Sequence, residues 1–441
     1  MIIPFRIRKR IIKISDTGEN MNKRKKTIFG SAIFLILYIG MGAMCYRLYL
    51  RQAIGFPGPM GRYMADLRSH MISGINRTGY SLLEVIYGFL LRTRKLNEKP
   101  AAVLLAVVTM LTVYLTWRVI KLLCPRGNRW ILHLMAFAAM FVMPLFLPMV
   151  NPYRYLGLQS GTIWHNDTYT GMKMGGMLVL LLYFRYQQTY RGRKIAGRYV
   201  GGLEMREWFA FTVTLILVNL LKPNFILCFA PAMAIMLLAD CIRDRGETLL
   251  KQILFGIPVL ISLVVVVYET AVLYQGGDSD SHVVFTMLYS LKFWNTHPIA
   301  SLFQSAAFPL MVLAGTWREL KTDRIYRASW LIWGIGLLEY LFLGESGERQ
   351  NHGNFSWGYS FCMFLVFVVC MCKMYQMLEK EWVQYRLSKK SIGAYLKTAD
   401  RKKRLRLLYL LAAVLLFGWH LGCGLKYSWM TYLGNPYLCD Y

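Results

Sequence analysis

Two residues in the segment after the first apolar run could act together in acid–base chemistry. Asp66 and His70 are four positions apart, so on a helix they would lie on one face and within reach of each other. A carboxylate held beside an imidazole can serve as the general base that takes a proton from a hydroxyl group. The alternative is an ordinary surface pair on a long loop, and the spacing alone leaves both interpretations open.

Two further polar clusters stand at the ends of later apolar runs. The segment 164–169 reads Trp-His-Asn-Asp-Thr-Tyr, a mixture that suits binding of a sugar and equally suits an aromatic belt at a membrane interface. Its candidate substrate-binding residues are His165, Asn166, Asp167 and Tyr169. Lys222, directly before Pro223, could bind a phosphate as a point charge or simply extend its ammonium group to the interface.

The segment 345–359 has the highest density of ionisable groups between two apolar runs. We expect it to line a substrate site, although Gly, Ser and Asn in the same segment are also typical of loops. Its candidates are Glu345, Glu348, Arg349, His352, Asn354 and Trp357. Arg349 suits an anionic oxygen because the planar guanidinium group can donate two hydrogen bonds to it.

No metal site is predicted, and no cofactor is expected to be required. Asp278 and Asp280 resemble an acidic metal-binding pair, but the surrounding Gly and Ser residues are equally typical of a solvated loop, so a divalent cation stays open. The nine cysteines show no paired spacing and are interpreted as small packing residues. The common nucleotide-binding, zinc-protease and serine-hydrolase motifs are missing from the sequence.

The composition indicates which elements must position these residues. Of 441 residues 56% are hydrophobic, and the mean hydropathy is +0.36. About eleven apolar runs are long enough, or nearly so, to cross about 30 Å of hydrocarbon. The sequence therefore predicts an all-α polytopic membrane protein, and it excludes a soluble enzyme, a secreted disulfide scaffold, a coiled coil and a disordered chain.

The charge distribution predicts the orientation. The net charge of +29 would suggest nucleic acid on a soluble protein, whereas on a membrane protein it indicates basic cytoplasmic loops, so no nucleic-acid partner is expected. The predicted spans are 28–46, 101–121, 130–150, 172–187, 207–222, 225–241, 252–274, 300–316, 328–344, 357–378 and 407–425. With 80–91 as a helix on the membrane surface, most Lys and Arg fall on the cytoplasmic side, with the N-terminus inside and the C-terminus outside.

This orientation divides the chain into segments. A basic cytoplasmic N-terminus, 1–27, precedes a single transmembrane domain over 28–425, and translation could start at Met1 or Met21. The external segments are 47–100, with surface helices, then 151–171, 275–299, 345–356 and the tail 426–441; the densest cytoplasmic loop is 379–406. All the clusters described above therefore face outward. The pattern favours a multi-pass protein of a bacterial plasma membrane.

With these motifs and this topology, the chain resembles the GT-C class of membrane glycosyltransferases. The resemblance rests on a first external loop that carries an acidic residue, Asp66, and on the segments 164–169, 222–225 and 345–359. It implies that Asp66 is the catalytic carboxylate, oriented by His70 or His165, and that Lys222, Arg349 and Arg68 neutralise the phosphate of the donor. The chain departs from metal-dependent members of the class because no acidic pair stands beside Asp66 in the first loop.

The implied reaction moves a sugar from a polyprenyl-phosphate donor to an acceptor hydroxyl, with inversion at the anomeric carbon. The expected partners are this lipid-linked donor, membrane lipids, and a glycan, lipid or polymer acceptor. Three other classes stay open: a polysaccharide polymerase or ligase, a transporter or flippase of a lipid-linked or anionic substrate, and a membrane scaffold without catalysis. A transporter would need polar groups at mid-membrane depth, and the spans offer few, such as Glu339.

Overall fold

The protein is almost entirely helical in a computed structural model, as predicted, and it is a polytopic membrane protein. The structure describes residues 5–55, 66–78, 81–91, 97–150, 159–189, 198–275, 282–294, 297–347, 350, 353–389 and 391–434. The α-helices are α1 (Phe5–Ile54), α2 (Asp66–Asn76), α3 (Leu82–Leu90), α4 (Glu98–Leu123), α5 (Arg129–Ala139), α6 (Asp167–Thr189), α7 (Met205–Leu221), α8 (Asn224–Arg243), α9 (Leu249–Gln275), α10 (Tyr289–Trp294), α11 (Pro298–Thr316), α12 (Arg324–Phe342), α13 (Ser356–Ser388), α14 (Ile392–Lys397) and α15 (Arg401–Leu433).

The remaining regular elements are small. A 3₁₀ helix spans Trp317–Lys321. Strand β1 (Tyr199–Val200) pairs with β2 (Leu203–Glu204), and β3 (Val283–Phe285) pairs antiparallel with β4 (Leu343–Glu345), with Val283 opposite Glu345. The second of these pairs holds one end of the 345–359 segment in place.

Within the described residues, seven helices are long and apolar enough to span a membrane: α1 from Gly30, α4, α8, α9, α11, α13 and α15. The other four predicted spans coincide with α5, α6, α7 and α12, which fall short in length or in apolar character. The low apolar character of α6 has a physical reason. Nearly all of its side chains are buried by other helices, so this helix has little surface to present to lipid. The number of eleven spans and the orientation stay predictions.

The predicted span 130–150 is helical only in its first half. Helix α5 ends at Ala139, and the chain then continues without regular structure to Val150. Pro144 and Pro148 lie in this part, and proline lacks the amide hydrogen that a helix needs. The amide of Met143 instead donates to the His420 carbonyl at 3.2 Å.

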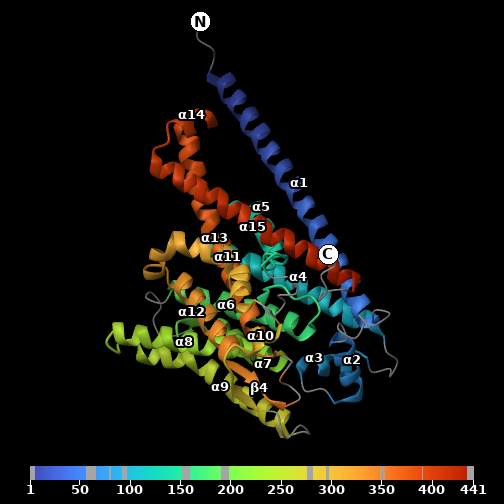
Figure 1. The fold of residues 1–441 in the computed structure, drawn as a ribbon. Coiled ribbons are helices and arrows are strands. Elements are labelled where there is room, and N and C mark those ends of the chain that lie inside the picture. Colours follow the sequence, from blue (N-terminus) through green and yellow to red (C-terminus); the bar gives the residue numbers. More distant parts are fainter. Residues whose placement is uncertain are drawn as a thin grey trace.

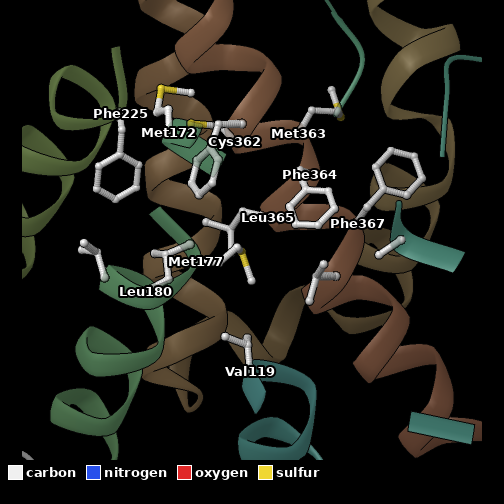
Figure 2. Packing of buried hydrophobic residues seen from close by; sticks show 14 of the residues in the cluster. Val119, Met172, Met177, Leu180, Phe225, Cys362, Met363, Phe364, Leu365 and Phe367 are labelled. Carbon is white, nitrogen blue, oxygen red and sulfur yellow. The ribbon is translucent and has the colours of Figure 1, made fainter. Parts of the chain in front are cut away.

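Helix α13 lies at the centre of the bundle (Figure 1), and four-fifths of its apolar window, 78%, is buried. Figure 2 shows its labelled residues facing side chains of α4, α6 and α8. Helix α6 approaches α13 closely at Gly176, where an added Cβ would lie 2.8 Å from the Phe361 ring. This core fixes the N-terminal end of α6, at which the candidate site is built.

Helices α2 and α3 form a separate pair beside the end of α1 (Figure 1). They touch backbone to backbone at Gly74 and Gly88, where neither position has space for a Cβ. A capping box begins α3: the Glu84 amide donates to Ser81 at 3.4 Å, and the Ser81 amide donates to the Glu84 carboxylate at 2.8 Å. The predicted surface helix at 80–91 is therefore confirmed as a helix and packs on the helix that carries Asp66.

Candidate functional site

His70 pairs with a carboxylate from a distant part of the chain. Its Nδ1 lies 2.6 Å from Oδ1 of Asp167, the first residue of α6. Asp66 and His70 do share helix α2, as predicted. The hydrogen-bond partner of the imidazole is nevertheless Asp167, and the prediction that His70 orients Asp66 has no hydrogen bond to support it among the described residues.

Asp167 is buried and fully engaged. Its second carboxylate oxygen accepts a hydrogen bond from the Tyr87 hydroxyl of α3 at 3.0 Å, and Oδ1 also accepts from the Thr168 amide at 2.9 Å. A carboxylate at the N-terminus of a helix is further stabilised by the helix dipole. Burial alone would raise the pKa of Asp167, but His70, Tyr87 and the Thr168 amide hold it below its ordinary value.

The charge of Asp167 acts on His70 in turn. Burial by itself would lower the pKa of His70, yet the Asp167 carboxylate and its hydrogen bond raise that pKa to about 9. The imidazole is therefore protonated at neutral pH. His70 enters the site as a cation bound to Asp167, whereas the sequence suggested only that it orients Asp66.

Asn166 holds both α6 and Asp66. Its Oδ1 accepts hydrogen bonds from the Tyr169 amide at 2.8 Å and the Thr168 hydroxyl at 3.0 Å, so it caps the first turn of α6. Its Nδ2 donates to Oδ2 of Asp66 at 3.2 Å. One side chain of the 164–169 segment thus positions the predicted base, whereas the sequence suggests a histidine for this role.

Lys222 lies just past the end of α7, directly beside α6. Its Nζ donates to the Thr168 hydroxyl at 3.2 Å and lies 4.9 Å from the centre of the Trp357 ring. Burial lowers the pKa of Lys222 to about 8, although the carboxylates of Asp66, Asp167 and Glu345 partly oppose this shift. The ammonium group is therefore close to these three carboxylates and within the same site.

The 345–359 segment closes the site from the opposite side. Nδ2 of Asn354 donates to the Glu345 carboxylate at 2.6 Å, and Nδ2 of Asn224 donates to the Asn354 carbonyl at 2.8 Å. These bonds connect β4, the start of α8 and the loop before α13. The other predicted residues of this segment, Glu348, Arg349 and His352, lie outside the described residues.

Some of these groups line a cavity of about 320 Å³, whereas Asp66, Asp167 and Trp357 are not among the described residues that line it. Its polar lining comes from α2, α6, α8, α9, α12, β4 and the segments next to α3, α7 and α13, and it comprises His70, Ser81, Thr168, Lys222, Asn224, Thr270, Glu339, Glu345 and Asn354. Two cations, His70 and Lys222, therefore line one cavity together with acidic and amide groups. Such a cavity fits a ligand that carries both an anionic group and hydroxyl groups.

His165 and Tyr169 are buried behind this cavity. Nδ1 of His165 is 3.3 Å from the Tyr427 hydroxyl, and its ring meets Trp357 edge-on at 6.4 Å. The Tyr169 hydroxyl donates to the Gly161 carbonyl at 3.1 Å, and its ring lies 5.8 Å from Trp357. Both residues lie within the predicted cluster, where they support Trp357.

Arg68 points away from the cavity. Its guanidinium donates to the Ala53 carbonyl at 3.1 Å and to the Ile54 carbonyl at 2.6 Å, at the C-terminal end of α1. It also lies 3.9 Å from the Glu98 carboxylate. These contacts give Arg68 a structural role, the attachment of α2 to α1, in the place where the sequence suggested phosphate binding.

Several contributing residues were not among the predicted ones. Tyr87 has no sequence signal beyond its place on a short apolar helix, whereas Thr168 and Asn224 stand inside the motifs 164–169 and 222–225. Glu339 was visible only as a carboxylate within an apolar run. Among the described residues no three His, Cys, Asp or Glu side chains cluster as a metal site would require, and Asp278 and Asp280 are outside them.

Two solved structures are similar to this chain over most of its length. One is ArnT from Cupriavidus metallidurans bound to undecaprenyl phosphate, with 13% identity, a TM-score of 0.45, and coverage of 91% of this chain and 75% of that chain. The other is the same protein in the apo state, with 12% identity, a TM-score of 0.41, and coverage of 92% and 76%. No family model and no curated protein matches the sequence.

Proposed function

We propose that this chain is a membrane glycosyltransferase whose donor is a sugar linked to a polyprenyl phosphate. The observation that carries the proposal is that a cavity with two cations borders an apolar groove. Leu221 lines both of them, and it directly precedes Lys222. A ligand with a phosphate next to a long hydrocarbon chain fits this arrangement.

The apolar groove has a volume of about 490 Å³ and lies between α3, α4, α6 and α7. Leucine, valine and methionine make up most of its lining, and glycines of α6 widen it. Val108 and Leu217, which line it, belong to helices of the membrane bundle. Burying an isoprenoid chain here would be favourable by about 25 cal/mol for each Å² of apolar surface removed from water.

In the proposed reaction Asp66 takes the proton from an acceptor hydroxyl. The acceptor oxygen then forms a bond to the anomeric carbon, from the face opposite the phosphate. The bond between this carbon and the phosphate oxygen breaks, and the electron pair leaves with the phosphate. The configuration at the anomeric carbon is therefore inverted.

Lys222 and His70 stabilise the negative charge that develops on the leaving phosphate. Fixed cations are most effective when they are held in place before the reaction. Thr168 holds Lys222, and Asp167 holds His70. Arg349, outside the described residues, remains a further proposed phosphate ligand.

Glu345, Asn354 and Trp357 are proposed to bind the sugar. A carboxylate and an amide accept and donate hydrogen bonds to hydroxyl groups, and an indole offers a flat apolar face. Glu348 and His352 are proposed to extend this set. We place the active site at the outer face of a bacterial plasma membrane, on the strength of the charge distribution.

The proposal is tested by transfer from polyprenyl-phosphate sugars in reconstituted vesicles. Asp66→Asn should slow transfer about 100-fold or more, since general bases contribute roughly 10²–10⁴-fold to rates, while donor binding is retained. Glu247→Gln, a change at an exposed carboxylate on the turn after α8, is the matched control and should leave the rate unchanged. Full activity of a correctly folded Asp66→Asn protein would disprove the role of the base.

A further inference from the structure

A second groove lies between α1 and α15, away from the cation-lined cavity. Its volume is about 520 Å³. Gly40, Ala43 and Met44 line its apolar part, and Arg47 lies further along α1 toward the end that contacts the site. The groove is open to the surroundings, because Trp429 on its rim is 59% exposed.

The groove changes from apolar to cationic along its length. At 1.5 Å per residue, Gly40 and Arg47 are about 10 Å apart along the helix axis. In the part of the chain that the structure describes, Arg47 forms no ion pair with a carboxylate. An apolar channel that ends at an exposed guanidinium fits an amphiphile with an anionic head, because arginine can donate two hydrogen bonds to one phosphate.

The two helices that form the groove face outward. Only 22% of the apolar window of α1 is buried, and the value for α15 is also 22%. In a membrane these helices contact the bilayer, whose phospholipids supply both a hydrocarbon chain and a phosphate. The occupant can therefore enter the groove sideways from the membrane.

The inner wall of the groove adjoins the candidate active site. The Phe141 ring, which lines the groove, lies 5.7 Å from the Trp164 ring. Gln52, about one turn beyond Leu48 on α1, donates to the Trp164 carbonyl at 3.0 Å. Two residues later, Asn166 holds Asp66.

We infer that this groove is a second lipid site, which binds an anionic membrane phospholipid with its phosphate at Arg47. The hydrocarbon chain of the bound lipid packs against Phe141. It thereby stabilises the neighbouring segment that contains Trp164 and Asn166. This site does not depend on the proposed transferase reaction.

The test is a titration of the full-length protein in detergent with phosphatidylglycerol, followed by native mass spectrometry, with phosphatidylcholine as the zwitterionic comparison. A Cβ at Gly40 meets no atom within 4 Å, so the backbone accepts Gly40→Leu, and the added side chain takes up space at the groove that Gly40 lines. We expect this variant to bind phosphatidylglycerol at least about fivefold more weakly, a change of about 1 kcal/mol. Gly418→Leu, also with no atom within 4 Å, lies outside the groove and should bind as the wild type does.

The charge is tested separately. Arg47→Gln alters an exposed side chain and should remove most of the preference for phosphatidylglycerol over phosphatidylcholine. Wild-type affinity in Gly40→Leu, or an unchanged lipid preference in Arg47→Gln, would overturn the inference. Lys222→Met serves to separate the two sites: it should lose the polyprenyl-phosphate donor and keep the phospholipid.

Discussion

The imidazole of His70 is bound to the buried carboxylate of Asp167, with 2.6 Å between Nδ1 and Oδ1. This pair joins α2, in the loop after the first helix, to the N-terminus of α6. The protonated imidazole also lines the cavity that Lys222 lines, and so brings a second positive charge to it.

Asp167→Asn should weaken binding of the donor phosphate about tenfold at neutral pH. The amide cannot stabilise the imidazolium as the carboxylate does, so the pKa of His70 falls toward its ordinary value and the cavity loses a positive charge. Isothermal titration with a polyprenyl-phosphate sugar measures this loss, and an NMR titration of His70 follows the pKa itself. An unchanged pKa in the variant would contradict the assigned pairing.

Donor binding should also weaken as the pH rises. Lys222 is cationic below its pKa of about 8 and His70 below its pKa of about 9. Their attraction for phosphate is therefore complete near pH 7 and is lost in two steps through pH 8 and pH 9. In Lys222→Met the lower step should disappear, and its persistence there would show that another group titrates.

Asn166→Ala should lower kcat more than it raises KM for the donor. The variant removes the hydrogen bond to Asp66, so the base is no longer held in place, while the direct partners of Lys222 and His70, Thr168 and Asp167, keep their side chains. It also removes a helix cap, which costs about 1 kcal/mol of stability. Thr431→Ala, also at a buried side chain but away from the cavity, serves as the control for stability without a catalytic effect.

Gly88→Ala should destabilise the pair of α2 and α3. The new methyl group would meet the Gly74 carbonyl, so the two helices must move apart. The expected cost is about 1–3 kcal/mol, as for other overpacked contacts, with a lower transfer rate because Tyr87 and His70 are displaced. Gly393→Ala, where a Cβ meets nothing within 4 Å, should unfold at the wild-type temperature.

Leu217→Trp should discriminate between donors by chain length. Leu217 lines the apolar groove, so the larger side chain competes with the hydrocarbon chain of the donor and leaves the phosphate site intact. Transfer from a long-chain donor should fall about tenfold, and transfer from a short-chain analogue should change little. Leu238→Trp, at an exposed position of α8, is the control. Equal losses for both donors would contradict the placement of the chain.

The sequence predicted helices and local clusters well because these depend on nearby residues. Each predicted span coincides at least in part with a helix. Lys222, Glu345 and Asn354, which belong to two of the predicted clusters, line the same cavity. Residue spacing could not show which carboxylate His70 would meet. Asp66 is four residues away and Asp167 is 97 residues away, and only the tertiary placement of α2 near the N-terminus of α6 decides between them.

Two other differences have similar causes. The position of Arg68 is determined by the C-terminal end of α1, where carbonyl groups accept its hydrogen bonds. This contact could not be predicted because the sequence does not mark where that helix ends. Helix α6 lacks the apolar character of a lipid-facing span because other helices surround it. In both cases a tertiary contact determined the role of a residue or an element.

The most direct test of the account is binding of a polyprenyl-phosphate sugar to wild type, Lys222→Met and Lys426→Met, measured by native mass spectrometry at pH 7. Lys426 is exposed on α15 and provides the matched loss of charge. The account predicts that the wild type and Lys426→Met retain the lipid-linked sugar and that Lys222→Met binds it at least about tenfold more weakly. Equal binding by all three proteins would contradict the central claim that the cavity at Lys222 holds the donor phosphate.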